Sequence, residues 1–298
     1  MKKIFPILLL AASTAAQAVV YDNGPFTNSG NLSLLQTSVT ATPPAPAAGV
    51  HSVFGVGVNN AAGVVVADDF AVGGATVIEH VEIFQYQTGA SSAVPTATGV
   101  FLEILNAAPS ASGTPVAGSS GFANNLFASN LVSHAFTGVF RVQDTALAGT
   151  RRPIMSVKVA LPTPVTLTAG VHWLQWSLTG LLASGPCCPP LAPLDQGATD
   201  NAEQRAGATA AWLPVVSGAV ASPFAQGMPF RRLGSAGTPY AITQTATACG
   251  FTGITVEGSP SAGGYLRTNL SNVLGAGVIG YGFTNQPVTL CGCTIAHS

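Results

Sequence analysis

The sequence predicts an all-β fold, an antiparallel β-sandwich of jelly-roll type followed by a small second β domain. Two observations predict it. First, 34 glycines and 21 prolines are spread along 298 residues, so few windows of a dozen residues are free of a helix breaker. Second, short apolar runs bounded by Gly, Pro, Asn and Ser recur along the chain, which is typical of sandwiches and barrels.

Three segments alternate apolar and polar residues with the two-residue period of a strand, namely 136–143, 154–161 and 171–178. In the second of these, Met155 and Val157 lie opposite Ser156 and Lys158. Successive side chains of a strand point to opposite faces, so we expect each segment to have one buried and one wet face. Such strands are typical of antiparallel sheets that are covered on one side.

The N-terminus has the three parts of a secretory signal peptide. Lys2 and Lys3 precede an apolar run over 4–12, and Ala-Gln-Ala at 16–18 fits a cleavage site. The run is much shorter than the ~20 residues that a spanning helix needs. We therefore expect a secreted or periplasmic protein whose mature chain begins at Val19.

Charged residues make up only 7% of the chain. Removal of the leader leaves eight basic against eleven acidic residues, a net charge of −3. Nucleic-acid binding needs a concentrated basic footprint, and none is present, so a nucleic-acid partner is excluded. No later run reaches 18 uninterrupted apolar residues, and we expect no transmembrane segment in the mature chain.

Composition divides the chain into four parts: a signal peptide (1–18), a β-sandwich domain (19–235), a linker (236–248) and a small β domain (249–298). Roughly 50 residues are few for an independently stable domain, so a disulfide is expected in the last part. The alternative is that this part is the front half of a longer domain.

Several short motifs resemble a group of exported, β-rich bacterial proteins. They are Tyr-Asp-Asn-Gly-Pro at 21–25, Val-Ala-Asp-Asp-Phe at 66–70, Arg-Pro-Ile-Met at 152–155, Trp-Leu-Gln-Trp at 173–176 and Ser-Gly-Pro at 184–186. The resemblance covers about residues 20–235 and implies export and a β-rich fold, but no activity. The cysteine-bearing tail is similar to a short β-module at the end of other secreted proteins.

Five cysteines are present: Cys187, Cys188, Cys249, Cys291 and Cys293. Export favours disulfides, and an odd number leaves at least one thiol unpaired or bound to another chain. We predict that Cys249 bridges Cys291 or Cys293, which stabilises the small domain by a few kcal/mol. A bridge between Cys187 and Cys188 would be strained, so one of them is expected to bind a different partner. The alternative is a thiolate site for a soft metal.

Asp68, Asp69 and Asp144 are candidate calcium ligands in a chain that has few carboxylates. Calcium binds six to eight oxygens, which loops of β-proteins often supply. No contiguous calcium loop is present. The alternative is that Asp68 or Asp69 pairs with an arginine or caps a turn. No other cofactor is expected.

Trp173 is a candidate platform for stacking on a sugar. Within 171–178, Trp176 shares a face with Leu174 and Leu178 and is expected in the core. Trp173 points to the opposite face and is therefore expected to be exposed. An exposed aromatic ring is compatible with a carbohydrate-binding role.

No catalytic motif is recognised: the G-x-S-x-G and H-E-x-x-H patterns are absent. Glu79, Glu82 and Glu103 lie on expected strands and could face a cleft, as the carboxylates of glycosidases do. We predict an exported, non-catalytic protein with a structural, adhesive or surface-contact role. Its expected partner is a polysaccharide, another surface component or a second copy of the chain. The alternatives are a carbohydrate-binding module and a secreted hydrolase with an unrecognised site.

Overall fold

The computed structural model describes residues 18–27, 31–37, 51–191, 201–219 and 222–234, and four strands nearer the C-terminus. These residues form an all-β fold, as predicted, with one short α-helix, α1 (Leu126–Asn130). Two 3-10 turns, Asn60–Ala62 and Pro109–Ala111, are the other helical elements in this part of the chain. Within the described ranges no helix is both long and apolar enough to cross a bilayer.

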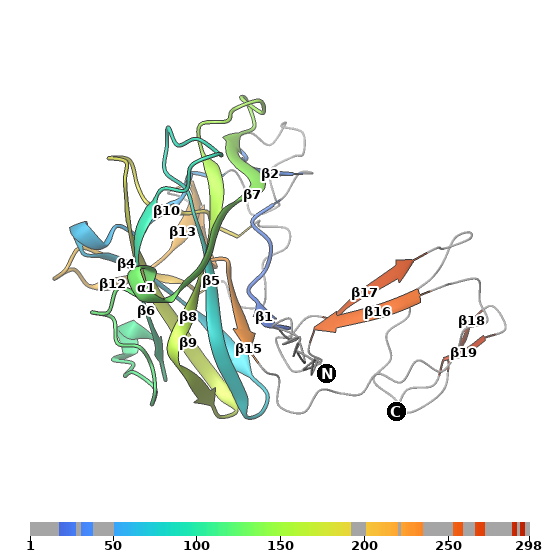
Figure 1. The fold of residues 1–298 in the computed structure, drawn as a ribbon. Coiled ribbons are helices and arrows are strands. Elements are labelled where there is room, and N and C mark those ends of the chain that lie inside the picture. The colour runs from blue at the N-terminus through green and yellow to red at the C-terminus, as the bar shows by residue number, and fades with distance from the viewer. Residues whose placement is uncertain are drawn as a thin grey trace, which may run out of the picture.

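The larger sheet has six strands, and the first and last strands of the 18–234 region are neighbours in it (Figure 1). The order is β1 (Ala18–Asp22), β15 (Phe230–Gly234), β5 (Thr76–Gln85), β8 (Pro153–Leu167), β7 (Leu131–Gln143) and β2 (Leu32–Leu35). All neighbours are antiparallel except β2, which runs parallel to β7.

The second large sheet has five antiparallel strands. The order is β12 (Trp212–Pro214), β11 (Glu203–Ala206), β4 (Val64–Val72), β9 (Gly170–Gly180) and β6 (Ala97–Leu105). Four two-stranded pairs complete the fold: β3 (Val56–Gly57) with β10 (Cys187–Cys188), β13 (Val216–Ala219) with β14 (Ser222–Ala225), β16 (Gly253–Gly258) with β17 (Leu266–Ser271), and β18 (Val288–Leu290) with β19 (Cys293–Ile295).

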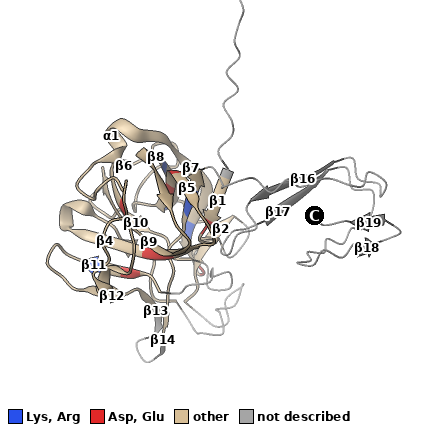
Figure 2. Cartoon of the chain, turned by 90° about the horizontal axis from the view of Figure 1, so that it is seen from below, with Lys and Arg blue, Asp and Glu red and all other residues tan. Residues whose placement is uncertain are grey.

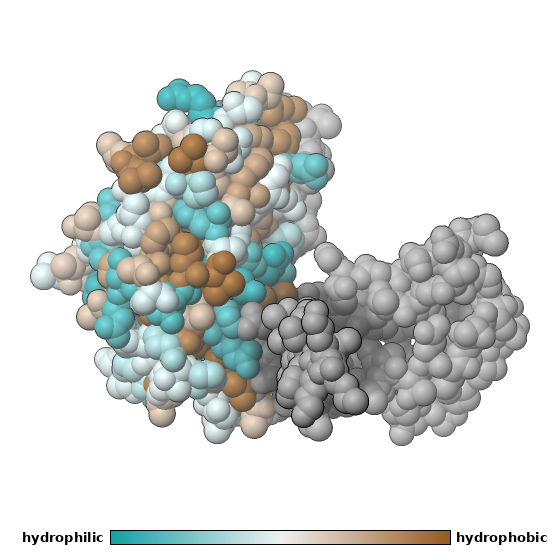
Figure 3. Space-filling view, viewed as in Figure 1, coloured by the Kyte–Doolittle hydropathy of each residue, from teal (hydrophilic) through white to brown (hydrophobic). Residues whose placement is uncertain are grey.

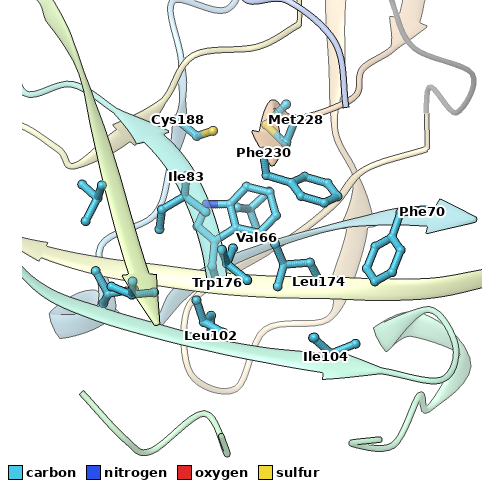
Figure 4. Packing of buried hydrophobic residues seen from close by; sticks show 14 of the residues in the cluster. Val66, Phe70, Ile83, Leu102, Ile104, Leu174, Trp176, Cys188, Met228 and Phe230 are labelled. Atoms are coloured by element: carbon cyan, nitrogen blue, oxygen red, sulfur yellow. The ribbon is translucent and has the colours of Figure 1, made fainter. Parts of the chain in front are cut away.

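One hydrophobic core joins the inner faces of the two large sheets (Figure 4). Trp176 of β9 lies at its centre, fully buried, with its ring centroid 5.7 Å from that of Phe230 on β15. Val157 of β8 is buried in the same core, whereas Ser156 and Lys158 on the opposite face are partly exposed. The two-face pattern predicted for 154–161 is therefore confirmed.

The strand that contains residues 136–143 departs from simple alternation. Its pairing with β8 shifts register between Phe136 and Phe140, where Gly138 has a φ of 85°. Positive φ is a conformation that glycine adopts without a steric penalty. The alternation over 136–143 predicts that Arg141 lies on the wet face of its strand. Beyond the bulge it is buried instead, and its guanidinium donates to the carbonyl oxygens of Phe54 (2.7 Å) and Val53 (2.9 Å). A buried arginine is tolerated when such acceptors replace water.

Candidate functional site

Asp68 and Asp69 are neighbours on β4, so their side chains lie on opposite faces of the sheet. Asp68 points into the core, where its Oδ2 accepts hydrogen bonds from Asn23 Nδ2 (2.7 Å) and the Met228 amide (2.6 Å). Its Oδ1 accepts from the Asp69 amide (2.9 Å). Asn23 in turn accepts a hydrogen bond from the Tyr21 hydroxyl (2.6 Å). This buried network connects the segment that follows β1 to the centre of the fold.

The structure does not bring the three predicted calcium ligands together. Asp144 follows β7, and its carboxylate accepts from the amide (2.6 Å) and the hydroxyl (2.7 Å) of Thr37. Among the described residues no group of three His, Cys, Asp or Glu side chains is placed to hold a metal ion. The expectation of a calcium site at Asp68, Asp69 and Asp144 is therefore corrected: Asp68 and Asp144 are hydrogen-bond acceptors that fasten separate parts of the chain.

Arg232 is buried near this network, and no carboxylate of the described residues forms an ion pair with it. Its side chain is 2% exposed, and its Cζ lies 3.9 Å from the ring centroid of Phe70 and 4.6 Å from that of Tyr21. Burial lowers the pKa of Arg232 to about 9. The buried guanidinium therefore contacts the faces of two aromatic rings. This cation–π attraction is stronger where water is excluded.

Charged residues also form a row on the outer face of the six-stranded sheet. Arg231 Nε lies 2.8 Å from Asp22 Oδ2, and its Nη1 lies 3.4 Å from Glu82 Oε2. The Ser156 hydroxyl donates to the other oxygen of Glu82. Figure 2 shows how sparse the charged residues are and that many lie on strands. Partly exposed pairs of this kind contribute about 0–1 kcal/mol each, and here they connect neighbouring strands.

The carboxylates and histidines that could serve catalysis are divided between the two large sheets. Glu82 is on the six-stranded sheet, whereas Glu103 is on the five-stranded sheet and accepts from Gln175 Nε2 (2.8 Å). His80 lies on β5, and His172 lies on β9 with its ring centroid 5.8 Å from that of Phe70. Paired groups facing one cleft, as hydrolysis would require, are not assembled by these residues.

Cys187 and Cys188 carry free thiols in the structure. They form β10, and an extended backbone directs adjacent side chains to opposite faces. Cys188 is fully buried, which raises the pKa of its thiol. No disulfide joins the two described cysteines, and the expectation that one of them binds a different partner stays a prediction. Of the remaining cysteines, Cys249 and Cys291 lie outside the described residues, and Cys293 is placed only as a backbone position of β19.

Trp173 is not the exposed platform that alternation predicts. It is 7% exposed and packs with Ala67 and Leu105 on the outer face of the five-stranded sheet. Ala108, which follows β6, and Trp212 of β12 pack against this cluster. The prediction of a sugar-stacking ring is wrong because a second small core covers this face, whereas the placement of Trp176 in the main core is confirmed.

Three loops meet at one end of the two large sheets. The strands β5, β7 and β9 all end there, so the connections 86–96, 144–152 and 181–186 lie at the same end (Figure 1). Backbone hydrogen bonds join them: Gly89 N donates to Arg151 O (2.7 Å), and Leu181 N donates to Thr96 O (2.9 Å). Gln87 Nε2 also donates to Leu182 O (2.7 Å). We refer to these three connections as the loop end.

The loop end carries exposed aliphatic side chains. They are Val94 (56% exposed), Leu147 (46%), Leu181 (65%) and Leu182 (36%). Figure 3 shows hydrophobic surface gathered toward the upper end of the molecule, where these loops lie in Figure 1. A single exposed leucine is ordinary, whereas four such side chains on three hydrogen-bonded loops make the loop end a candidate contact surface.

A groove of about 360 Å³ lies between β3 and the strands β11 to β13. Its lining includes Val53, Val56, Leu213 and Val216, and Gln204 is its only polar side chain. The Gln204 amide already donates to Gly57 O (2.8 Å). The groove can therefore hold an apolar group, but its lining has no acid, base or nucleophile to act on one.

No family model, curated protein or solved structure matches this chain. A functional assignment therefore depends on the side chains and their placement.

Sequence reasoning missed the loop end and Arg232. For the loops, a usable signal is an apolar residue enclosed by turn formers, as in Leu181-Leu182 before Ala-Ser-Gly-Pro or Leu147 between alanines. No residue pattern distinguishes Arg232 from Arg231, because strand pairing decides which of the two faces the core.

Proposed function

We propose that this protein is an exported, non-catalytic contact protein, and that the loop end is the surface that binds its partner. Export follows from the leader at 1–18, and the motif resemblance supports it. The observation that carries the contact role is the set of four exposed aliphatic side chains on three hydrogen-bonded loops. A surface-contact role needs such a presented patch and does not need clustered titratable groups.

The loops are suited to presenting side chains because each begins at a strand of a large sheet; 86–96 and 144–152 also end at one, and 181–186 ends at β10, which pairs with β3. Gln87 and Arg152 add side-chain bonds within the loop end, to Leu182 O (2.7 Å) and to Thr88 Oγ1 (3.2 Å). A surface that is ordered before binding loses less conformational entropy when the partner docks. This order supports recognition by contact.

The test is retention of the exported protein on the cell envelope fraction of its own host. We expect Leu181→Ser combined with Leu182→Ser to reduce retention by at least about tenfold, because two buried leucine side chains contribute more than 1.4 kcal/mol. Val171→Ser is the matched control, since Val171 is 53% exposed at the beginning of β9, at the opposite end of the sheet. Equal retention of the wild type and the loop variant would contradict the proposal.

A further inference from the structure

We infer that the partner of the loop end is an anionic phospholipid surface, an inference that rests on the proposed function and names its partner. Arg151 would contact the lipid phosphate, and Val94, Leu147, Leu181 and Leu182 would enter the boundary between headgroups and acyl chains. Three features of the loop end support this assignment: its side-chain chemistry, its charge and its geometry.

The exposed side chains are aliphatic and not aromatic. The three loops contain one aromatic residue, Tyr86, and it is buried. Sugar recognition commonly uses exposed rings, which the loop end does not present. Valine and leucine are suited to hydrocarbon, and membrane binding grows with the apolar area that enters the interface. The chemistry therefore favours lipid over polysaccharide.

The loop end presents positive charge without a free carboxylate. Its charged residues are Asp144, Arg151 and Arg152. Asp144 is bonded to Thr37, while Arg152 donates to Thr88 and lies 4.1 Å over the Phe54 ring. Arg151 is exposed, and its guanidinium has no hydrogen bond or ion pair with the described residues. An available guanidinium is complementary to phosphate, which arginine binds through paired N–H donors.

The geometry suits an extended, flat partner. The four aliphatic side chains come from three separate loops, which lie at the same end of the two large sheets. The cationic side chain, Arg151, belongs to the same loop as the aliphatic side chain of Leu147. This is the combination of charge attraction and shallow apolar insertion that peripheral membrane binding uses.

The test is cosedimentation of the full exported chain with vesicles of phosphatidylcholine alone and of phosphatidylcholine with phosphatidylglycerol. We expect binding to the anionic vesicles that is weakened by salt, and little binding to the neutral ones. Arg151→Gln should weaken anionic binding about fivefold, the effect of one basic residue near a charged surface. Leu181→Ser with Leu182→Ser should weaken it by at least about tenfold.

The matched controls are Val171→Ser at the opposite end and Leu213→Ser in the groove, which is 64% exposed. Both should bind as the wild type does. Thermal midpoints verify that each variant is folded, and Leu181→Ser alone replaces the double variant if its midpoint falls. Equal binding to both vesicle types, no binding of the wild type, or unchanged binding of the loop variants would overturn the inference.

The outcomes separate this inference from the proposed function. If vesicles do not bind but the leucine variant loses envelope retention, the lipid assignment is wrong and the loop end contacts a polysaccharide or a protein. If neither vesicle binding nor envelope retention depends on the leucines, both proposals are wrong.

Discussion

His51 illustrates how the fold selects one protonation state of a buried side chain. Its Nδ1 accepts a hydrogen bond from the Gln36 amide (3.4 Å), which requires the unprotonated nitrogen. Burial, and secondarily the guanidinium of Arg141, lowers the pKa of His51 to about 4; a backbone hydrogen bond with Leu34 and the Asp144 carboxylate act in the opposite direction. Burial alone lowers the pKa of His134 to about 4 as well.

These two histidines contribute stability that is lost in mild acid, whereas the raised pKa of the buried Asp68 carboxyl acts in the opposite direction. Their ordinary pKa is 6.5, above the folded value of about 4. At these two sites the unfolded chain therefore binds more protons between these values, so their contribution to stability is full above pH 6.5 and falls as pH decreases toward 4. His51 alone accounts for a loss of up to about 3 kcal/mol. Urea midpoints at pH 7.5, 5.5 and 4.5 measure it.

His51→Asn is the informative variant, because an amide oxygen can accept the same hydrogen bond without titrating. We expect it to remove the share of the pH dependence that belongs to His51, up to about 3 kcal/mol, and to leave the shares of the other titrating groups. If the variant and the wild type lose stability equally between pH 7.5 and 4.5, the assignment to His51 is wrong.

At the residue scale, alternation predicted some side chains and failed for others. Trp176 and Val157 are in the core as predicted. Trp173 and Arg141 lie on faces that were expected to be wet, and both are buried. The two-residue alternation of a strand determines to which face a side chain points, but not which other segment covers that face. Distant segments supply the cover, so no local pattern reveals it.

At the scale of elements, β6 is an edge strand of the five-stranded sheet. Side chains of the segment that follows it form hydrogen bonds with the backbone groups of β6. Asn125 Oδ1 accepts from the Val100 amide (3.1 Å), and Ser119 Oγ accepts from the Ile104 amide (2.9 Å). Ser120 Oγ donates to Leu102 O (2.8 Å). An edge strand with open backbone groups can pair with another chain, and these side chains occupy the groups first.

Asn125 is the sharpest probe of this edge, because its Oδ1 also caps α1 by accepting from the Phe127 amide (3.0 Å). Asn125→Ala should lower the free energy of unfolding by about 1–2 kcal/mol through loss of both bonds, and should increase aggregation on heating. Asn125→Asp keeps the acceptor oxygen and should stay within about 0.5 kcal/mol of the wild type. Denaturant titration and light scattering measure the two effects; equal destabilisation by Ala and Asp would contradict this role of the oxygen.

At the scale of the whole molecule, the first described strand, β1, pairs with the last strand of the 18–234 region. β1 pairs with β15, more than 200 residues later, and Asn23 Nδ2 bonds both Asp68 Oδ2 (2.7 Å) and Met228 O (2.8 Å). Burial raises the pKa of Asp68 well above its usual range, although its three N–H donors act in the opposite direction. The N-terminal motif therefore has a structural explanation that its sequence did not predict.

Asn23→Ala should cost about 2–3 kcal/mol, because it removes the acceptor of the Tyr21 hydroxyl, the side-chain donor to Met228 O and one of the two hydrogen bonds to Asp68 Oδ2. The neighbouring Asp22→Ala removes only a partly exposed ion pair with Arg231 and should cost at most about 1 kcal/mol. Thermal and urea unfolding of the two variants compares them directly. Equal losses would show that the buried network does not support the fold.

The sequence by itself determined the fold class, because frequent glycine and proline together with two-residue periodicity are local properties. These local properties did not determine the sheet order, the cover over Trp173, the core position of Arg232 or the meeting of three loops. Those features depend on strand pairing between residues far apart in the chain, such as β1 with β15. Only the tertiary structure could decide them, because local residue preferences do not specify which distant segment packs on a given face.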